Sequence, residues 1–270
     1  MSLTTFHRDG LDLSAWDDGG DGLPVLFQHG LCGAQGQPAE IFPTAPGLRR
    51  LTLECRGHGA SPSGPLDRLS IRTFTDDAAA FLQASTSRPA VVGGISMGAA
   101  IALRLAITRP DLVCALVIAR PAWTTRHAPA NMAPNALVGR LLARHPPDTA
   151  LRLFLQSPLA TRLRRQAPDN LASLLSFFTR SPQAVTAALL QRISADGPAI
   201  AETDLARLQV PTLVLGHGLD LIHPLRHVRT LARAIPDARL AEITPKAVSP
   251  VCYRDDFRVV LAGFLTRFPK

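Results

Sequence analysis

The sequence contains no long apolar run, few aromatic residues and almost no lysine. Its 270 residues include no stretch of about 18 consecutive apolar side chains, which argues against a transmembrane helix. There is one tyrosine, and aromatic residues do not alternate with basic ones, so no stacking platform for single-stranded nucleic acid is predicted. Of 29 basic residues only Lys246 and Lys270 are lysines, so the net charge of +8 reflects an arginine-biased composition. We expect neither a nucleic-acid nor a membrane partner.

Cysteine pairs are also missing. The four cysteines are scattered, with no CxxC and no cysteine–histidine spacing typical of a metal site. The first 20 residues are polar and acidic and do not look like a secretory signal. Free thiols without an export signal indicate a reducing compartment, and we expect a cytoplasmic location. No metal or organic cofactor is predicted, and the oligomeric state cannot be deduced from the composition.

Short apolar segments alternate with helical periodicity at both ends of the chain. Near-continuous apolar strands alternating with amphipathic helices are typical of a parallel sheet covered on both faces. The N-terminal segment, with DG and GG turns, is predicted as an antiparallel hairpin at the sheet edge. The expected strands are 23–28, 48–54, 90–94, 115–119, 210–218 and 238–245, and the expected helices are 71–85, 97–109, 225–236 and 253–268.

The middle of the chain has a different character. Residues 123–207 contain helical periodicity interrupted by prolines and no convincing strand. We interpret this segment as a helical cap inserted into a core formed by residues 1–122 and 208–270. Its apolar side chains predict a largely hydrophobic pocket roof: Leu141, Leu142, Phe154, Leu171, Leu174, Phe177 and Phe178.

The most informative segment is VVGGISMGAAIALRLA, in which Gly94-Ile95-Ser96-Met97-Gly98 matches G-x-S-x-G. An apolar strand precedes it and a helix follows, as a nucleophile elbow requires. Small residues on either side of the serine relieve collisions at the sharp turn and leave its hydroxyl above the sheet. A dinucleotide-binding turn is the competing interpretation, but G-x-G-x-x-G is absent and Arg120 ends the next strand where an acidic residue would be expected.

Together with two further turns, this motif resembles the α/β-hydrolase family over nearly the whole chain. Gln28-His29-Gly30-Leu31 resembles the family's HG oxyanion turn, and the segment 56–61 resembles its RGxGxS turn. Asp220, in GHGLDLIHP, matches the family's triad acid, although it could instead cap the helix that begins near Pro224. The resemblance implies a mainly parallel eight-stranded sheet with flanking helices and an inserted cap. It also implies an oxyanion hole made by the backbone N–H groups of Leu31 and Met97.

The family's catalytic histidine is missing from its usual place. It is expected in the loop after the last strand, where the sequence reads EITPKAVSP, and no histidine follows His227. Val248 falls close to the expected position. A serine hydroxyl without an adjacent base is a poor nucleophile, so this departure concerns function more than fold.

Four alternatives remain open for the base. His223 lies three residues beyond Asp220, and Lys246 lies in the loop where the histidine is expected. A cap histidine, His127 or His145, could reach down from the insertion. The last alternative is that no base exists.

The leading hypothesis from the sequence is a serine hydrolase of a small, partly apolar carboxylic ester or lactone. Ser96 would attack, Leu31 and Met97 would hold the oxyanion, Asp220 would orient the base, and His223 is the candidate base. The rival hypothesis is a non-hydrolytic or ligand-binding member of the same fold with an incomplete triad.

Overall fold

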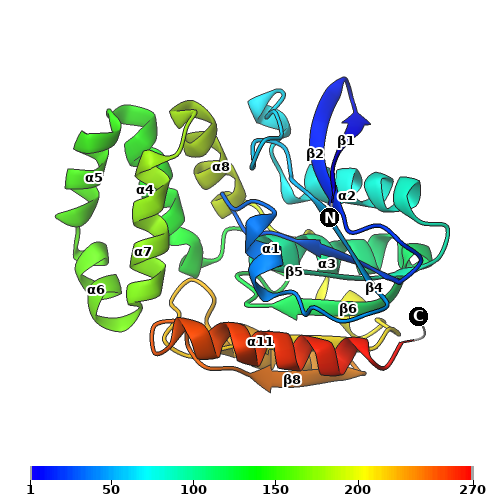
Figure 1. The fold of residues 1–270 in the computed structure, drawn as a ribbon. Coiled ribbons are helices and arrows are strands. Elements are labelled where there is room, and N and C mark those ends of the chain that lie inside the picture. Colours follow the sequence, from blue (N-terminus) through cyan, green and yellow to red (C-terminus); the bar gives the residue numbers. More distant parts are fainter. Residues whose placement is uncertain (1, 269–270) are drawn as a thin grey trace.

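A single twisted sheet forms the centre of the protein in the computed structural model, which describes residues 2–268 (Figure 1). Within these residues the sheet has eight strands in the order β1-β2-β4-β3-β5-β6-β7-β8. The strands are β1 (Ser2–Arg8), β2 (Leu11–Asp17), β3 (Leu23–Gln28), β4 (Leu48–Leu53), β5 (Ala90–Ile95), β6 (Val113–Ala119), β7 (Thr212–Gly216) and β8 (Ala238–Glu242).

The sheet is parallel except at one edge. β1 pairs with β2, and β2 with β4, in antiparallel register, whereas every pair from β4 to β8 is parallel. The predicted edge hairpin and the predicted mainly parallel eight-stranded sheet are therefore confirmed. Because the strands from β4 onward run the same way, their carboxyl ends lie along one edge, where loops from several strands can meet.

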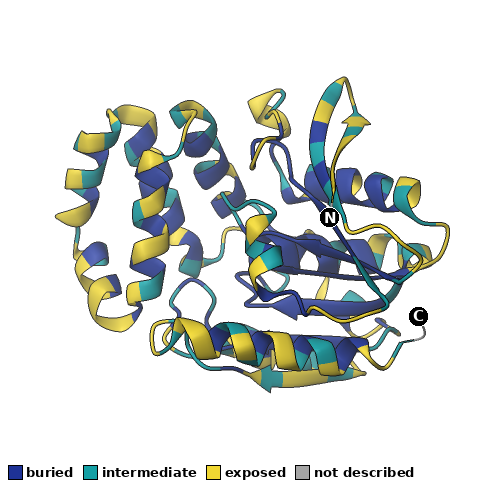
Figure 2. Ribbon diagram, viewed as in Figure 1, coloured by how far each residue is buried: buried dark blue, intermediate teal, exposed yellow. Residues whose placement is uncertain are grey.

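Helices cover both faces of the sheet. Successive residues of a strand point to opposite faces, so Val91 packs in one core cluster and Val92 in the other. The core helices are α1 (Gly36–Ile41), α2 (Ile71–Ser85), α3 (Met97–Thr108), α10 (Leu225–Ala234) and α11 (Pro250–Leu265). α2, α3 and α10 share the core cluster of Val92, and α1 and α11 share that of Val91. The centre of the sheet is buried throughout (Figure 2).

The chain between β6 and β7 is helical, as the sequence predicts, and most of it lies beyond the carboxyl ends of the strands (Figure 1). Its helices are α4 (Ala133–Arg144), α5 (Pro147–Leu155), α6 (Pro158–Gln166), α7 (Pro168–Ser176), α8 (Gln183–Ala195) and α9 (Glu202–Leu205). Short 3₁₀ turns are η1 (Leu66–Arg68), η2 (Pro110–Leu112), η3 (Ala130–Met132) and η4 (Phe177–Thr179). We call residues 123–207 the cap; the boundaries at which it joins the core stay a prediction.

The cap has an apolar interior of its own. Phe154, Leu163 and Leu190 are fully buried, and α4 packs against α8. Four cap helices begin with proline in their first turn, where the missing N–H costs nothing because it would have no helical partner. The prolines that interrupt the sequence pattern therefore mark where helices start.

The last strand and last helix differ slightly from the sequence expectation. β8 ends at Glu242 rather than at residue 245, and α11 begins at Pro250 rather than at residue 253. Pro245 cannot donate to a ladder, and the Ser249 hydroxyl caps α11 by accepting from the Cys252 N–H. None of the helices within residues 2–268 is long and apolar enough to cross a membrane.

The turn from β5 into α3 requires glycine at position 98, because there is no room for a side chain there. A Cβ at Gly98 would collide with the backbone carbonyl of Gln28 and would lie 2.8 Å from the carbonyl oxygen of His29. The obstacles are backbone atoms of the neighbouring strand end, which cannot move without disturbing β3. Gly98 therefore sets how closely α3 approaches the loop after β3.

We expect Gly98→Ala to lower the free energy of unfolding by at least about 2 kcal/mol, because the added methyl overpacks a rigid contact. Denaturant titration of wild type and variant measures the difference. Gly263→Ala in α11 is the matched control: nothing lies within 4 Å of its added Cβ, so it should be neutral or stabilise by up to about 1 kcal/mol. Equal stability of Gly98→Ala and wild type would contradict the account.

Candidate active site

Ser96 stands at the junction of β5 and α3 in a strained backbone conformation. Its φ is 57° and its ψ −107°, outside the regions that L-residues usually occupy. Its N–H donates to the Ala119 carbonyl of β6 at 3.0 Å, and α3 follows directly. Neighbouring strand and helix thus impose the strain, and the sequence prediction of a sharp elbow at this serine agrees with the observed backbone.

His223 lies next to this serine. Its Nε2 is 2.8 Å from the Ser96 Oγ, and its Nδ1 is 2.9 Å from Asp220 Oδ2. With Asp220 ionised, Nδ1 carries the proton and donates to the carboxylate, which leaves Nε2 to accept from the serine hydroxyl. The three side chains therefore form a hydrogen-bonded serine–histidine–aspartate series, in which the histidine and the aspartate come from one loop, between β7 and α10.

The Asp220 carboxylate accepts from backbone as well as side chains. Oδ1 accepts from the N–H groups of His223 at 2.8 Å and Ile222 at 3.1 Å. These bonds close a tight turn over residues 220–223 and direct the imidazole toward Ser96. Asp220 makes no side-chain cap for α10, whose N-cap residue is Pro224.

Arg120, directly after β6, is a second side-chain partner of Asp220, besides the His223 ring. Its Nη2 and Nε lie 2.7 Å and 3.1 Å from Oδ2, and its Nη2 is also 3.2 Å from Asp169 of α7. Burial alone would raise the pKa of Asp220, but the charge of His223 when protonated and that of Arg120 hold it well below its usual value. Burial alone would lower the pKa of Arg120, but the nearby carboxylates of Asp220 and Asp169 outweigh it and raise this pKa.

Two asparagines of the cap region fix the loop that carries His223. Asn170 Oδ1 accepts from the N–H groups of Leu221 at 2.8 Å and Ile222 at 3.1 Å. Asn131 Nδ2 donates to the carbonyls of Ile222 at 2.7 Å and Ala122 at 2.8 Å. The backbone on both sides of Ile222 is thus held by the cap, so the position of the imidazole depends on the cap being in place.

The two amides expected to form an oxyanion hole lie beside the serine. Met97 follows Ser96 at the first position of α3, and Leu31 follows the HG turn and lines the same cavity as Ser96. Within residues 2–268 neither N–H donates a hydrogen bond. The Gly30 N–H donates to Gln37 Oε1 at 2.6 Å, which fixes the turn before Leu31. Both amides are thus available to a ligand.

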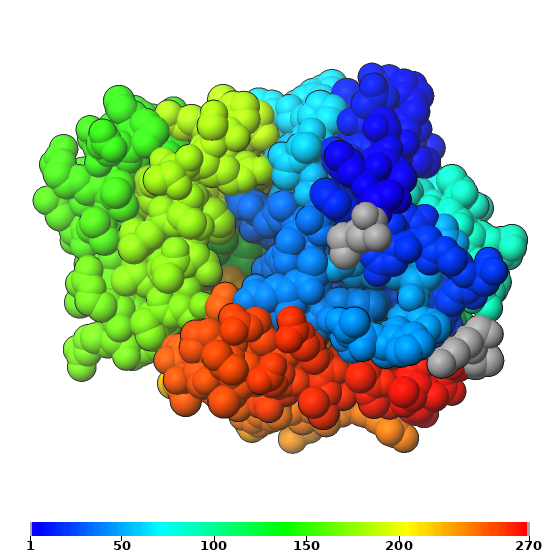
Figure 3. Space-filling model, viewed as in Figure 1, coloured from blue at the N-terminus to red at the C-terminus, as the bar shows by residue number. Residues whose placement is uncertain are grey.

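A cavity of about 80 Å³ opens in front of Ser96. Its lining combines core and cap: Gly30, Leu31, Gln37, Ile95, Ser96, Arg120, Asn135, Asn170, Ser173, Leu174, Phe177, Ile222 and His223. In Figure 3 the surface is indented where the cap meets the core. Of the apolar cap residues predicted to form the roof, only Leu174 and Phe177 line this cavity; the others pack inside the cap or outside the lining. The expectation of a largely hydrophobic roof is wrong, because Asn135, Asn170 and Ser173 share it.

The other candidate bases lie away from the serine. Val248, near the family's usual histidine position, is 65% exposed. Lys246 Nζ lies 3.9 Å from Asp169 Oδ1 and 6.0 Å from the Tyr253 ring centroid. His127 is 3.6 Å from Asp196, and neither it nor His145 lines the cavity. Only His223 among the four histidine and lysine candidates is within hydrogen-bonding distance of Ser96 in the described chain.

Nearby thiol and imidazole groups are buried in structural positions. Burial raises the pKa of Cys32 to about 12, so its thiol is not a nucleophile near neutral pH. His29 donates from Nδ1 to the Gly30 carbonyl at 2.9 Å and accepts from the Cys55 N–H at 3.1 Å, and burial lowers its pKa. His217 lies behind Asp220, with Nε2 3.9 Å from Oδ2. No group of three or more His, Cys, Asp or Glu side chains in the described part is placed to hold a metal ion.

Backbone strain gathers around this site. Four non-glycine residues with positive φ follow the carboxyl ends of four neighbouring strands: Cys32 (59°), Ser96 (57°), Arg120 (45°) and Leu219 (55°). Such conformations each cost about 1–3 kcal/mol and persist where surrounding structure enforces them, often at functional sites. Their clustering independently marks this edge of the sheet as the functional one.

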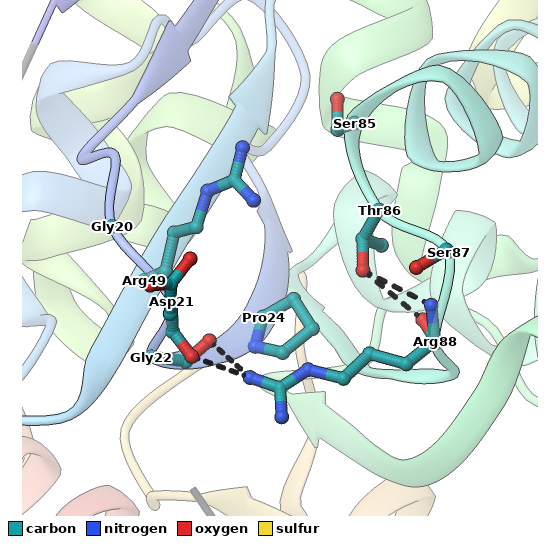
Figure 4. A pocket seen from close by; sticks show the side chains of 9 residues that line it. All are labelled: Gly20, Asp21, Gly22, Pro24, Arg49, Ser85, Thr86, Ser87 and Arg88. Carbon is teal, nitrogen blue, oxygen red and sulfur yellow. Dashed lines mark hydrogen bonds between the residues drawn. The ribbon is translucent and has the colours of Figure 1, made fainter.

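A larger hollow, of about 320 Å³, lies at the opposite ends of the strands (Figure 4). Its two arginines are already engaged. Arg88 donates to the carbonyls of Asp21 and Gly22 at 2.8 and 2.6 Å, and Arg49 forms a two-bond ion pair with Asp17. This hollow contains no nucleophile–base pair.

The sequence motifs point to Ser96 and Asp220 but not to the polar residues around them. Arg120 stands out in the sequence only as unlike the acidic residue of a dinucleotide site, and Asn131, Asn135 and Asn170 belong to no motif. An arginine directly after an apolar strand could have suggested an acidic partner at the same edge, since a charge next to a buried strand is rarely left unpaired.

Comparison with known proteins agrees with this architecture. The family model described as alpha/beta hydrolase fold matches residues 24–246. The chain is 33% identical over 260 residues to pimeloyl-[acyl-carrier protein] methyl ester esterase of Chromobacterium violaceum, covering 91% of this chain and 95% of that protein. It is 32% identical over 131 residues to sn-1-specific diacylglycerol lipase ABHD11 of Danio rerio, of which it covers only 41% of the length.

Among solved structures, the enol-lactonase of Burkholderia xenovorans LB400 superposes with a TM-score of 0.72 at 23% identity, covering 96% of this chain and 98% of that one. At this identity the likeness concerns the fold. The family match and the full-length esterase relative together establish that the chain belongs to the α/β-hydrolase family.

The buried ion pair at Asp220 predicts a specific pH dependence. Because its pKa in the folded protein is lowered from 3.8, its contribution to stability is fully present above about pH 4 and is lost as the pH falls toward the lowered value. We expect Asp220→Asn to lower the free energy of unfolding by about 3 kcal/mol near neutral pH, because a buried partner of Arg120 loses its charge. The difference from wild type should shrink as the pH falls below about 4.

Denaturant titration of both proteins at several pH values measures this difference. Asp76→Asn is the control, since Asp76 is exposed and has no ion pair in the described part of the chain. Its effect should stay below about 0.5 kcal/mol near neutral pH. A wild-type advantage over Asp220→Asn that stays constant or grows toward acid pH would contradict the assignment.

Proposed function

We propose that this protein is a serine hydrolase that cleaves a small carboxylic ester through an acyl-enzyme. The observation that carries the proposal is the 2.8 Å contact between His223 Nε2 and Ser96 Oγ, in series with the 2.9 Å contact between His223 Nδ1 and Asp220. A base within hydrogen-bonding distance, oriented by a carboxylate, is what a serine needs to become nucleophilic. The same contact weighs against the alternative of a binding protein with an incomplete triad.

The proposed reaction assigns one role to each group. His223 Nε2 removes the hydroxyl proton as Ser96 Oγ attacks the ester carbonyl, and the oxyanion accepts hydrogen bonds from the Leu31 and Met97 N–H groups. His223 then protonates the leaving alcohol. Water, activated by the same imidazole, hydrolyses the acyl-enzyme and regenerates Ser96. Asp220 stays ionised and steadies the imidazolium.

The substrate class follows from the cavity and the relatives. A volume of about 80 Å³ lies far below the roughly 300–1,000 Å³ of drug-sized ligand sites, so it accommodates a short acyl or alkyl group. The relative that is 33% identical over 91% of the chain is a methyl ester esterase, which supports ester over lactone chemistry.

We expect the wild-type protein to hydrolyse p-nitrophenyl acetate and to be labelled by a fluorophosphonate probe. Ser96→Ala should abolish labelling and lower kcat/KM by at least about 10³-fold, because the nucleophile is lost while the fold is kept. Release of p-nitrophenol and in-gel fluorescence measure the two effects. Undiminished hydrolysis or labelling in Ser96→Ala, or neither activity in the folded wild type, would contradict the proposal.

A further inference from the structure

One polar side chain of the cavity lining has no partner. Asn135, in the first turn of α4, lines the cavity with Ser96 and His223 and is 5% exposed. Its Oδ1 is buried and accepts no hydrogen bond, and its amide nitrogen donates none within the described part of the chain. The carboxamide thus lies between cap and catalytic centre with its hydrogen-bonding capacity unused.

The other amide oxygens of the lining and its arginine already have partners. Gln37 Oε1 accepts from the Gly30 N–H, and Asn170 Oδ1 accepts from two backbone N–H groups of the His223 loop. Arg120 is engaged by Asp220 and Asp169. Ser173 is exposed and can bond to water. Asn135 is therefore the lining residue, within residues 2–268, whose side-chain oxygen is buried without a partner.

The buried Asn135 side chain destabilises the fold, because no hydrogen bond within the described residues offsets the loss of its contacts with water. A buried polar group without a partner destabilises the fold, because it gives up its hydrogen bonds to water without replacement. Asn135 does not cap α4, whose N-cap residue is Met132 and has no side-chain bond. An apolar side chain of similar volume would avoid the cost. A ligand that satisfies the amide is a physical reason for retaining it.

The charges around the cavity indicate that the ligand group is neutral. The Arg120 guanidinium is matched by the carboxylates of Asp220 and Asp169, and Lys246 lies 3.9 Å from the latter. No unpaired charge in the described lining therefore faces the ligand. A hydroxyl fits these conditions, since it is neutral and can donate to Oδ1 or accept from the amide nitrogen. Because Asn135 and Ser96 line the same small cavity, a hydroxyl close to the reacting carbonyl would share it with the Asn135 amide.

We propose that Asn135 is a specificity-determining residue that binds a hydroxyl group on the acyl chain of the substrate. This inference rests on the proposed esterase function and narrows it to short hydroxyacyl esters. The hydrogen bond replaces water lost when the substrate enters, and an ester without the hydroxyl leaves the amide unsatisfied.

The test compares p-nitrophenyl butyrate with p-nitrophenyl 2- and 3-hydroxybutyrate, both enantiomers of each, in wild type and Asn135→Leu. For each protein, the measured quantity is the ratio of kcat/KM for a hydroxylated ester to kcat/KM for p-nitrophenyl butyrate. For one of the hydroxylated esters, we expect this ratio to be about tenfold higher in wild type than in Asn135→Leu. Taking the ratio between variants removes the effect of the hydroxyl on intrinsic ester reactivity. Thermal unfolding should show Asn135→Leu to be at least as stable as wild type, since an unsatisfied buried amide is removed.

Gln156→Leu is the matched control, because it makes the same kind of change at an exposed cap position outside the cavity lining. It should retain the wild-type ratio. Equal ratios in wild type and Asn135→Leu would overturn the assignment of Asn135 and leave the esterase proposal standing. A lower thermal stability of Asn135→Leu would also overturn it, because the amide would then have a structural role.

Binding to Ser96→Ala separates the two proposals. This variant cannot turn the esters over by the proposed route, so a shift in its melting temperature reports binding alone. If the wild type hydrolyses none of the esters but Ser96→Ala prefers a hydroxylated ester and Asn135→Leu/Ser96→Ala does not, the hydroxyl subsite is supported and the esterase proposal fails. Absence of both hydrolysis and selective binding overturns both.

Discussion

The arrangement of the site depends on the Asp220 carboxylate and the four donors around it. His223 supplies both its backbone N–H and its ring N–H, Ile222 supplies a backbone N–H, and Arg120 supplies its guanidinium. A buried carboxylate without such partners would be protonated or would destabilise the fold. Here the backbone donors close the 220–223 turn, the ring donor fixes the imidazole, and Arg120 ties the turn to the end of β6. The same hydrogen bonds therefore compensate the buried charge of Asp220 and hold the His223 ring beside Ser96.

Under the proposed function, this turn takes the place of a histidine after the last strand. The proposed acid and base are three residues apart in one loop, so a single tight turn fixes their mutual distance, whereas the family's usual arrangement brings them from two loops. This loop is in turn held by hydrogen bonds to Asn131 and Asn170 of the cap region. The cap is therefore linked to the loop of His223: a movement of α7 away from the core would break the bonds of Asn170 to Leu221 and Ile222, while the bonds to Asp220 would still hold the 220–223 turn.

The fold and the nucleophile elbow could be predicted from the sequence because both follow from local pattern. Apolar strands alternating with helical periodicity specify the parallel sheet, and the glycines around Ser96 specify a turn that only small residues permit. The identity of the base could not be predicted in this way. It depends on where a side chain three residues beyond Asp220 points, which is decided by hydrogen bonds between segments about 50 to 100 residues apart.

The polar lining of the cavity could not be predicted from the sequence either, because it also depends on contacts between distant segments. In the cap sequence, apolar residues at helical spacing are conspicuous, yet most of them, such as Phe154, fill the cap's own interior. Single asparagines carry no periodic signal, so Asn135 and Asn170 become meaningful only once the helices are packed. Because the apolar faces of the cap helices pack mainly against one another, polar side chains such as Asn135 and Asn170 make up much of the cap surface that faces the cavity.

The most direct test of the account is chemical rescue of His223→Ala by imidazole added to the solution. If His223 is the base, the substitution should lower kcat/KM for p-nitrophenyl acetate by at least about 10³-fold, and free imidazole should restore part of it in a Ser96-dependent manner. Lys246→Ala, which changes the candidate in the family's usual loop, should keep nearly full activity. A His223→Ala variant as active as wild type, or an activity lost in Lys246→Ala instead, would contradict the account.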